Sequence, residues 1–596
     1  MLDVDLATGR IRRTERDPGE WADRPGGALI ALDLIAEAEA AGAIGDDAPV
    51  VLAGGVVAGF RFPGLARAGA VGRSPLTGGV VDARIEGHFP AALRDCGLTA
   101  ISVRGRASAP CYLLVTPDGA RIADARELWG RTTGQATELL RRRHGRAARV
   151  AAIGPAGEHR VAFADIVCDG GFAAARGGLG ARWGAKRLKA VVVLPGEPAE
   201  PFDPERLGAL GHRFRAALPG SVLATGQRRP PGFGAWMGTA AAEGYGVVEN
   251  YRTSRLPAPN PLAARAFLAA LRWDGGACPG CPVDCVKGFG TEGHGPGGSA
   301  LALHQEAVAA LGPNLGVYDL PEILRANAAC HRLGLDPVSA GLTLGWACEV
   351  AEHGIALAPD APRFGQPHRL GRWLGRIAHR EGLGDLLADG VAAAARQTRP
   401  DLAMQAGGME LSTFDPRRLP GLAVAWAASP LGIRYDAAEH DIDFDPAEGL
   451  PDAAARLAEL GLEPLPGAEL SPRKARRTAR LLELWSGLEA LGVCVFAGPP
   501  TRVLSVADVC EVLAAAGGLD ADAQRILHWG RERLARARRL HPDPDAAELP
   551  DRFFTEPIDA GPAAGAVLDR ARFAQARAEL ARALGWAEGS DPVSSV

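Results

Sequence analysis

The pattern of apolar and polar positions divides the chain into two unlike parts. Up to about residue 195, short β-favouring runs alternate with Gly, Pro and Asp, as in PVVLAGG (49–55), CYLLVTPDG (111–119) and LKAVVVLPG (188–196). Beyond about residue 200, apolar residues recur with a period near 3.6, as in LPEILRANAACHRLGL (320–335) and AQRILHWGRERLARARRL (523–540). The pattern therefore predicts an α+β protein, with a β-rich N-terminal region followed by a mainly α-helical remainder.

The length and two irregular segments predict three domains. A chain of 596 residues is too long for one hydrophobic core, because single cores stop growing at about 250–300 residues. The Pro- and acid-rich segment GEPAEPFDPER (196–206) separates the two patterns, and MQAGGMELSTFDPRRLPG (404–421) interrupts the helical one. We therefore expect a β-rich domain over 1–202 and helical domains over 203–405 and 406–596.

Composition and charge restrict the partners and the compartment. Lys and Arg together number 66 against 70 Asp and Glu, so the net charge of −4 gives no general attraction to polyanions such as nucleic acid. The first residues, MLDVDLATGR, have neither the basic start nor the apolar stretch of a signal peptide, and no apolar run is long enough for a membrane span. We expect a cytoplasmic protein with a small-molecule substrate and no membrane or nucleic-acid partner.

The segment CPGCPVDC places three thiols, Cys278, Cys281 and Cys285, three and four residues apart. Ten cysteines in so long a chain are too dilute for a disulfide scaffold, so clustered thiols favour metal binding or catalysis. An iron–sulfur cluster commonly takes three cysteines from one segment and a distant fourth. A structural zinc closed by His294 is an alternative, although such sites usually carry two paired half-sites. A segment that binds no metal is the third.

Several motifs in the same order resemble the aldehyde ferredoxin oxidoreductase family of tungsten or molybdenum enzymes. They include GRSPLTGG (72–79), IGPAGEHRVAFADIVCDGG (153–171), AAARGGLGARWGAKRLKAV (173–191), CPGCPVDC (278–285) and ALGVC (490–494). The resemblance covers essentially the whole chain. It implies an N-terminal domain that forms a base for a bis-pterin cofactor and two helical domains that close over it, in agreement with the boundaries above.

The resemblance also implies the ligands of both redox groups. A 4Fe-4S cluster would be held by the three clustered cysteines and by Cys494 as the fourth ligand. Pterin phosphates need backbone N–H groups and fixed positive charge, which RGGLGARWGAK supplies through Arg176, Gly177, Gly178 and Gly180. From the residues alone, a glycine-rich turn with solvated charges is the alternative. The segment lacks the third glycine of GxGxxG, so a nicotinamide site is disfavoured.

Further positions follow from the same resemblance. Arg67 matches an arginine between the pterin and the cluster, and the backbone carbonyls of Arg84 and Ala173 match those that bind magnesium. The stretches HRLGLD and EALGVC resemble two pterin-binding loops that begin with aspartate in the family. Here the leading residues are His331 and Glu489, and the first loop ends at Asp336.

The resemblance implies a catalytic carboxylate and an activity. Glu306 matches the family's glutamate at the metal, whereas an exposed helix glutamate is the plain alternative. The family's active-site histidine has no counterpart, and Tyr435 and His440 are the nearest candidates. The expected reaction is oxidation of an aldehyde to a carboxylate, with electrons passed to a ferredoxin or a small iron–sulfur subunit. A non-catalytic member that keeps a metal for structure, and a low-potential reductase of another substrate, are the alternatives.

Overall fold

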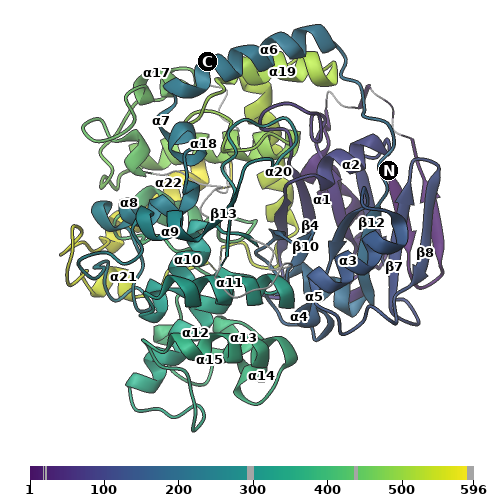
Figure 1. Ribbon diagram of the computed structural model, residues 1–596. Coiled ribbons are helices and arrows are strands. Elements are labelled where there is room, and N and C mark those ends of the chain that lie inside the picture. The colour runs from purple at the N-terminus through teal and green to yellow at the C-terminus, as the bar shows by residue number, and fades with distance from the viewer. Residues whose placement is uncertain are drawn as a thin grey trace.

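The strands of the N-terminal region form two six-stranded sheets (Figure 1). The computed structural model describes residues 1–15, 17, 19–20, 23–290, 301–434, 441–545 and 547–586. The first sheet has the order β2-β1-β6-β3-β4-β5. Its strands are β1 (Leu2–Asp5), β2 (Arg10–Arg13), β3 (Val50–Gly54), β4 (Ala68–Arg73), β5 (Val80–Ile85) and β6 (Ala100–Arg104).

The second sheet has the order β11-β10-β9-β12-β7-β8. Its strands are β7 (Cys111–Thr116), β8 (Gly119–Asp124), β9 (Arg149–Ala152), β10 (Ile166–Cys168), β11 (Phe172–Ala174) and β12 (Leu188–Val193). β12 is buried at every position, which explains its nearly unbroken apolar run. The edge strand β11 contacts β5, the edge strand of the first sheet. The two sheets therefore meet at the edge that carries Arg84 and Ala173.

Helices cover the sheets and build the rest of the chain, so the predicted α+β class is confirmed. The N-terminal region contains α1 (Gly27–Ala40), α2 (Phe89–Asp95), α3 (Thr133–His144), α4 (Pro155–Glu158) and α5 (Leu179–Ala185). The next part contains α6 (Pro204–Ala217), α7 (Val222–Arg228), α8 (Trp236–Glu243), α9 (Ala264–Ala270), α10 (Gln305–Leu311), α11 (Leu320–Leu333), α12 (Pro337–Glu352), α13 (Leu370–His379), α14 (Leu383–Leu387) and α15 (Val391–Ala395). Two small sheets interrupt the helices, one of β13 (Leu271–Asp274), β14 (Lys287–Phe289) and β15 (Leu301–Ala302), the other of β16 (Gln405–Ala406) and β17 (Met409–Glu410).

The last third is formed by helices, of which α18 and α20 pack against α1 on the first sheet (Figure 1). They are α16 (Pro420–Trp426), α17 (Ala453–Ala458), α18 (Pro472–Leu491), α19 (Val506–Gly517), α20 (Ala523–Arg539), α21 (Arg552–Thr555) and α22 (Arg570–Ala583). One large core joins residues of the N-terminal sheets to these helices, while a second core lies within 156–403. Within the part of the chain that the structure describes, no helix is both long and apolar enough to cross a membrane.

Helix α18 crosses α20 so closely that glycine is required at the contact. A Cβ atom on Gly530 would lie 1.7 Å from the Glu483 carbonyl oxygen, and one on Gly487 would lie 2.2 Å from that of Ile526. α18 then ends at Gly492, whose φ of 89° is the left-handed conformation typical of a helix C-terminus. The close packing fixes the end of α18, and with it Glu489 and Cys494.

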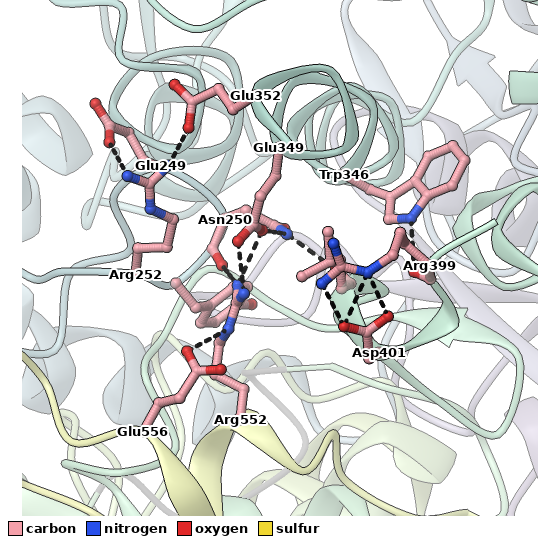
Figure 2. A network of polar contacts seen from close by, with 12 residues as sticks. Glu249, Asn250, Arg252, Trp346, Glu349, Glu352, Arg399, Asp401, Arg552 and Glu556 are labelled. Carbon is pink, nitrogen blue, oxygen red and sulfur yellow. Dashed lines mark hydrogen bonds and ion pairs between the residues drawn. The ribbon is translucent and has the colours of Figure 1, made fainter. Parts of the chain in front are cut away.

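A buried ion pair fastens α12 to α21 (Figure 2). Arg552 Nη2 lies 2.6 Å from Glu349 Oε1, and both side chains are only 4% exposed. Asn250 contacts both residues. Its side-chain N–H donates to Glu349 Oε2 at 2.6 Å, and its backbone carbonyl accepts from Arg552 Nη1 at 2.7 Å. The pair thereby links the middle helices to the C-terminal ones.

We expect Arg552→Ala to lower the unfolding midpoint in guanidinium strongly. It leaves the Glu349 carboxylate buried without its charge partner, a change that typically costs about 3–5 kcal/mol. The matched control is Arg142→Ala, which breaks a pair with Glu138 whose side chains are 67% and 62% exposed; such pairs contribute about 0–1 kcal/mol. Equal midpoints for the two variants would contradict the assigned role of the buried pair.

Candidate active site

A central cavity of about 190 Å³ lies where the meeting edges of the two sheets face the helices. We call it the central cavity. Six of the predicted site residues form part of its wall, namely Arg84, Ala173, Arg176, Glu306, His331 and Asp336. Arg84 comes from β5 and Ala173 from β11, while Glu306 begins α10, His331 ends α11 and Asp336 caps α12. The sequence-based set therefore converges from five elements on one space.

The glycine-rich turn before α5 lies behind this wall. Arg176, Gly177 and Gly178 all have left-handed backbone, with φ of 73°, 81° and 76°. A Cβ on Gly178 would come within 1.8 Å of the Ala162 carbonyl oxygen, and one on Gly180 within 2.4 Å of that of Asp165. These glycines are thus needed for the packing of the turn, and their contact with a pterin phosphate stays a prediction.

Arg176 holds the turn to the loops opposite. Its guanidinium donates to the Ile433 carbonyl at 3.1 Å and to Asp336 Oδ2 at 3.3 Å. Asp336 also accepts a 2.9 Å hydrogen bond from the Val338 backbone N–H, so it caps α12. One arginine therefore joins three segments around the cavity.

Buried arginines give the cavity an unusual concentration of positive charge. Arg84 and Arg434 line it, and Arg67 and Arg533 lie beside them, each no more than 8% exposed. Burial lowers the pKa of Arg84 well below its usual range, and the neighbouring guanidiniums of Arg434 and Arg67 lower it further. Burial also lowers the pKa of Arg434 to about 9.

Three carboxylates offset part of that charge, one of them Glu86, which pairs with Arg67. Glu489 pairs with Arg84 and lies 3.1 Å from Arg533, and Asp82 also pairs with Arg533. The repulsion between guanidiniums persists beside these pairs, so an anion in the cavity would stabilise the arginines. The site therefore fits an anionic group such as a pterin phosphate. Glu489, which the resemblance assigned to the pterin, faces the arginines here.

The four cysteines predicted as cluster ligands converge from two segments. Three follow β13 in the loop before β14, and Cys494 follows the end of α18, where its backbone N–H donates to the Gly64 carbonyl at 2.7 Å. Burial raises the pKa of the Cys285 thiol, and the other three thiols raise it further, which shows their proximity.

The arrangement differs from a site for one ion. Among the residues that the structure describes, no group of three or more His, Cys, Asp or Glu is placed to hold a single metal ion. A closed zinc site would draw its four ligands to about 2.3 Å from one centre. The structure brings the four thiols together, and their binding of an iron–sulfur cluster stays a prediction. His294, the alternative zinc ligand, lies outside the described residues.

Arg67 and Glu86 lie between the thiols and the cavity. Arg67 pairs with Glu86, and its guanidinium carbon lies 5.7 Å from the centre of the Phe496 ring. Glu86 and Phe496 line the cavity, while Arg67 lowers the pKa of the Cys494 thiol against the larger effect of burial. Arg67 thus lies near both Cys494 and the cavity wall, and its place between a pterin and a cluster stays a prediction.

Glu306 is a partly buried carboxyl with an altered proton affinity. The Ser412 hydroxyl donates to its Oε1 atom. Burial raises the pKa of Glu306 to about 7, although the hydrogen bond from Ser412 and the charge of Arg176 act in the opposite direction. A carboxyl with this pKa can both take and give a proton near neutral pH. The alternative of an exposed helix glutamate is wrong.

His331 faces the cavity as a neutral side chain. Burial lowers its pKa to about 4, and its ring is hydrogen-bonded to the Ala302 backbone. The corresponding pterin-binding loops of the resembling family begin with a charged aspartate, whereas this chain has an uncharged ring at that position. The two candidates for the missing histidine, Tyr435 and His440, lie outside the described residues.

Sequence reasoning gave no role to several residues of the wall, among them Glu86, Phe233, His304 and Phe496. His304 stands two residues before Glu306, and Phe496 stands two residues after Cys494. A short distance in sequence from a predicted residue was the one signal that could have identified His304 and Phe496. The contacts among the wall residues join distant parts of the chain, so the sequence does not show them.

Comparison with known families matches nearly the whole chain. The model of the aldehyde ferredoxin oxidoreductase N-terminal domain matches residues 1–195, and that of domains 2 and 3 matches residues 218–594. A tungsten-containing aldehyde ferredoxin oxidoreductase of Pyrococcus furiosus is 30% identical, over 95% of this chain and 93% of its own length. A protein of the same name from Thermococcus kodakarensis is 29% identical, over 99% of this chain and 96% of its own length.

Two further comparisons reach proteins with other names. The WOR-like subunit of an aliphatic sulfonate oxidoreductase from P. furiosus is 27% identical, over 66% of each chain. The solved active-site complex BamBC of benzoyl-coenzyme A reductase, bound to 1,5-dienoyl-CoA, contains a chain with a TM-score of 0.81 and 21% identity. The match covers 98% of this chain and 94% of that one. This last likeness establishes a shared fold.

We expect Cys494→Ser to lose iron as severely as Cys281→Ser, because both thiols face the same group. The measurement is iron content and visible absorption of anaerobically purified protein. Cys510→Ser, which changes a half-buried thiol on α19, is the matched control and should retain its iron. Loss of metal in His294→Ala together with retention in Cys494→Ser would favour the zinc alternative.

Proposed function

The chain belongs to the aldehyde ferredoxin oxidoreductase family, and on that premise we propose that it is a tungsten- or molybdenum-pterin enzyme. Its default reaction would be oxidation of an aldehyde: aldehyde and water give a carboxylic acid, two protons and two electrons. A ferredoxin or a small iron–sulfur subunit would accept the electrons one at a time. The observation that carries the proposal is the placement of the partly buried Glu306 in the cavity that the arginines line, beside four converging thiols.

The residues of the wall have distinct parts in this proposal. Arg84, Arg434 and Arg176 would hold the anionic pterin, with His331 and Asp336 at its ring and the carbonyls of Arg84 and Ala173 at a magnesium ion. The bound groups would supply two-electron and oxygen-atom transfer at the tungsten or molybdenum, and single-electron transfer at a 4Fe-4S cluster.

Glu306 would handle the proton. As a carboxylate it would take a proton from water as water attacks the carbonyl carbon of the aldehyde, and it would later release that proton. Its first-turn position on α10 and its hydrogen bond from Ser412 fix the carboxyl at the wall. The surrounding burial keeps bulk water from competing for that proton.

Two alternatives remain candidates. The names of the relatives extend to an aliphatic sulfonate oxidoreductase, so a low-potential reaction on another substrate fits the same site. A non-catalytic scaffold is less consistent with a partly buried Glu306 whose pKa is raised to about 7, because carboxyls with such shifted pKa values are concentrated at functional sites.

Elemental analysis tests the proposal directly. Anaerobically purified protein should contain tungsten or molybdenum, extractable pterin and about four iron atoms, the number in one 4Fe-4S cluster. Full zinc occupancy without iron or pterin would instead indicate the scaffold alternative.

We expect turnover to rise with pH through about 7, because Glu306 acts as a base only when it is deprotonated. Glu306→Gln should keep its metal and pterin, lose about 10²- to 10⁴-fold in turnover, and lose this pH dependence. The matched control is Glu138→Gln on the exposed face of α3. It should leave turnover and the pH dependence of turnover unchanged. Near-normal turnover of a fully loaded Glu306→Gln protein would refute the role. The assay measures aldehyde oxidation with an artificial electron acceptor.

A further inference from the structure

The central cavity has an apolar end that the proposed function does not explain. Phe233 lies on the short helix η4 (Gly232–Ala235), and Phe496 lies in the loop after Cys494. Their ring centres are 5.1 Å apart with an edge-to-face tilt of 62°. Leu303 and Val286 extend this wall. An apolar surface of this kind does not suit the anionic part of a cofactor.

His304 completes the apolar end as a third ring. Its centre lies 4.4 Å from that of Phe233 and 6.2 Å from that of Phe496. We call these three rings the aromatic subsite. His304 immediately precedes α10 and Glu306 lies in its first turn, so both side chains reach the cavity from the same helix end.

The surroundings of His304 keep its ring uncharged. Burial lowers its pKa to about 4, the nearby Arg67 guanidinium lowers it further, and the Glu86 carboxylate acts in the opposite direction. A neutral imidazole has one N–H donor and one acceptor nitrogen. Such a ring can donate a hydrogen bond to a carbonyl oxygen without placing a charge among apolar side chains.

We propose that the aromatic subsite binds the substrate, and that the substrate is an aldehyde with a flat apolar group. The apolar group packs against Phe233 and Phe496, and the carbonyl oxygen accepts a hydrogen bond from the His304 ring. The carbonyl carbon then faces the same space as Glu306. This inference rests on the proposed function and specifies its substrate class.

The packing argument follows from ring geometry. Edge-to-face and offset contacts favour a further planar ring beside an existing aromatic pair. A short aliphatic aldehyde such as acetaldehyde would leave the aromatic wall partly uncovered, whereas benzaldehyde would cover it. The subsite should therefore favour benzaldehyde over acetaldehyde in kcat/KM.

The first experiment measures that preference in the holoenzyme. Phe233→Leu and Phe233→Ala should reduce the ratio of kcat/KM for benzaldehyde over acetaldehyde by about tenfold or more, as expected for lost apolar contacts. Phe214→Leu is the matched control, because Phe214 is a buried ring on α6 that packs against Phe62 away from the cavity. An unchanged ratio in both Phe233 variants would overturn the subsite.

The second experiment separates hydrogen bonding from packing at His304. His304→Phe keeps a ring but removes the donor, so kcat should fall by about 10²-fold while the preference for benzaldehyde persists. His304→Gln restores an N–H donor and should recover part of kcat. His144→Gln, a change at a half-buried histidine hydrogen-bonded to Tyr112, is the control. A kcat for His304→Phe within twofold of the wild type would refute the role of His304.

A binding measurement distinguishes this inference from the proposed function. Benzoate and acetate, the carboxylate products of the two aldehydes, are titrated into metal-loaded protein by calorimetry. Wild-type protein should bind benzoate more tightly, and Phe233→Leu should lose that difference. Equal affinities in the wild type would overturn the subsite even in an active enzyme. A benzoate preference in a loaded protein that oxidises no aldehyde would overturn only the proposed function.

Discussion

The burial of several guanidinium groups around one cavity is the constraint on which the site depends. Arg67, Arg84, Arg434 and Arg533 are each almost completely buried, and removing such charges from water is costly unless they are paired. Asp82, Glu489 and Glu86 provide part of the compensation. Because the guanidiniums still lower one another's pKa, the remaining demand is for an anion in the cavity.

This charge arrangement requires distant segments to be held together. Arg84 belongs to the first sheet, Glu489 to α18 and Arg533 to α20. The glycine contacts between α18 and α20 fix two of these segments, and the same end of α18 places Cys494 beside the other thiols. Packing of the helices therefore sets the anion site and the thiol group at once.

Sequence patterns predicted much of this structure, and their failures have physical causes. Short apolar runs indicated the strands β3, β7 and β12, which are buried at nearly every position, and apolar periodicity indicated α11 and α20, which each bury one face. Motif resemblance singled out Glu306, which lines the cavity, and Cys494, which lies near the other three thiols; their roles stay predictions. His304 and Phe233 escaped notice because what matters about them is their mutual packing, which local patterns do not record. For Glu489 the motif suggested contact with a cofactor, and the structure adds that its side chain pairs with arginines.

The central claim is that the buried arginines require an anion in the cavity, and pyrophosphate can serve as a probe of it. Thermal unfolding of protein produced without tungsten or molybdenum would be measured with increasing pyrophosphate. A ligand that binds only the folded state raises the melting temperature, so we predict a rise for the wild type and for Arg142→Met, and a much smaller one for Arg434→Met. No rise in the wild type, or equal rises in all three proteins, would contradict the claim.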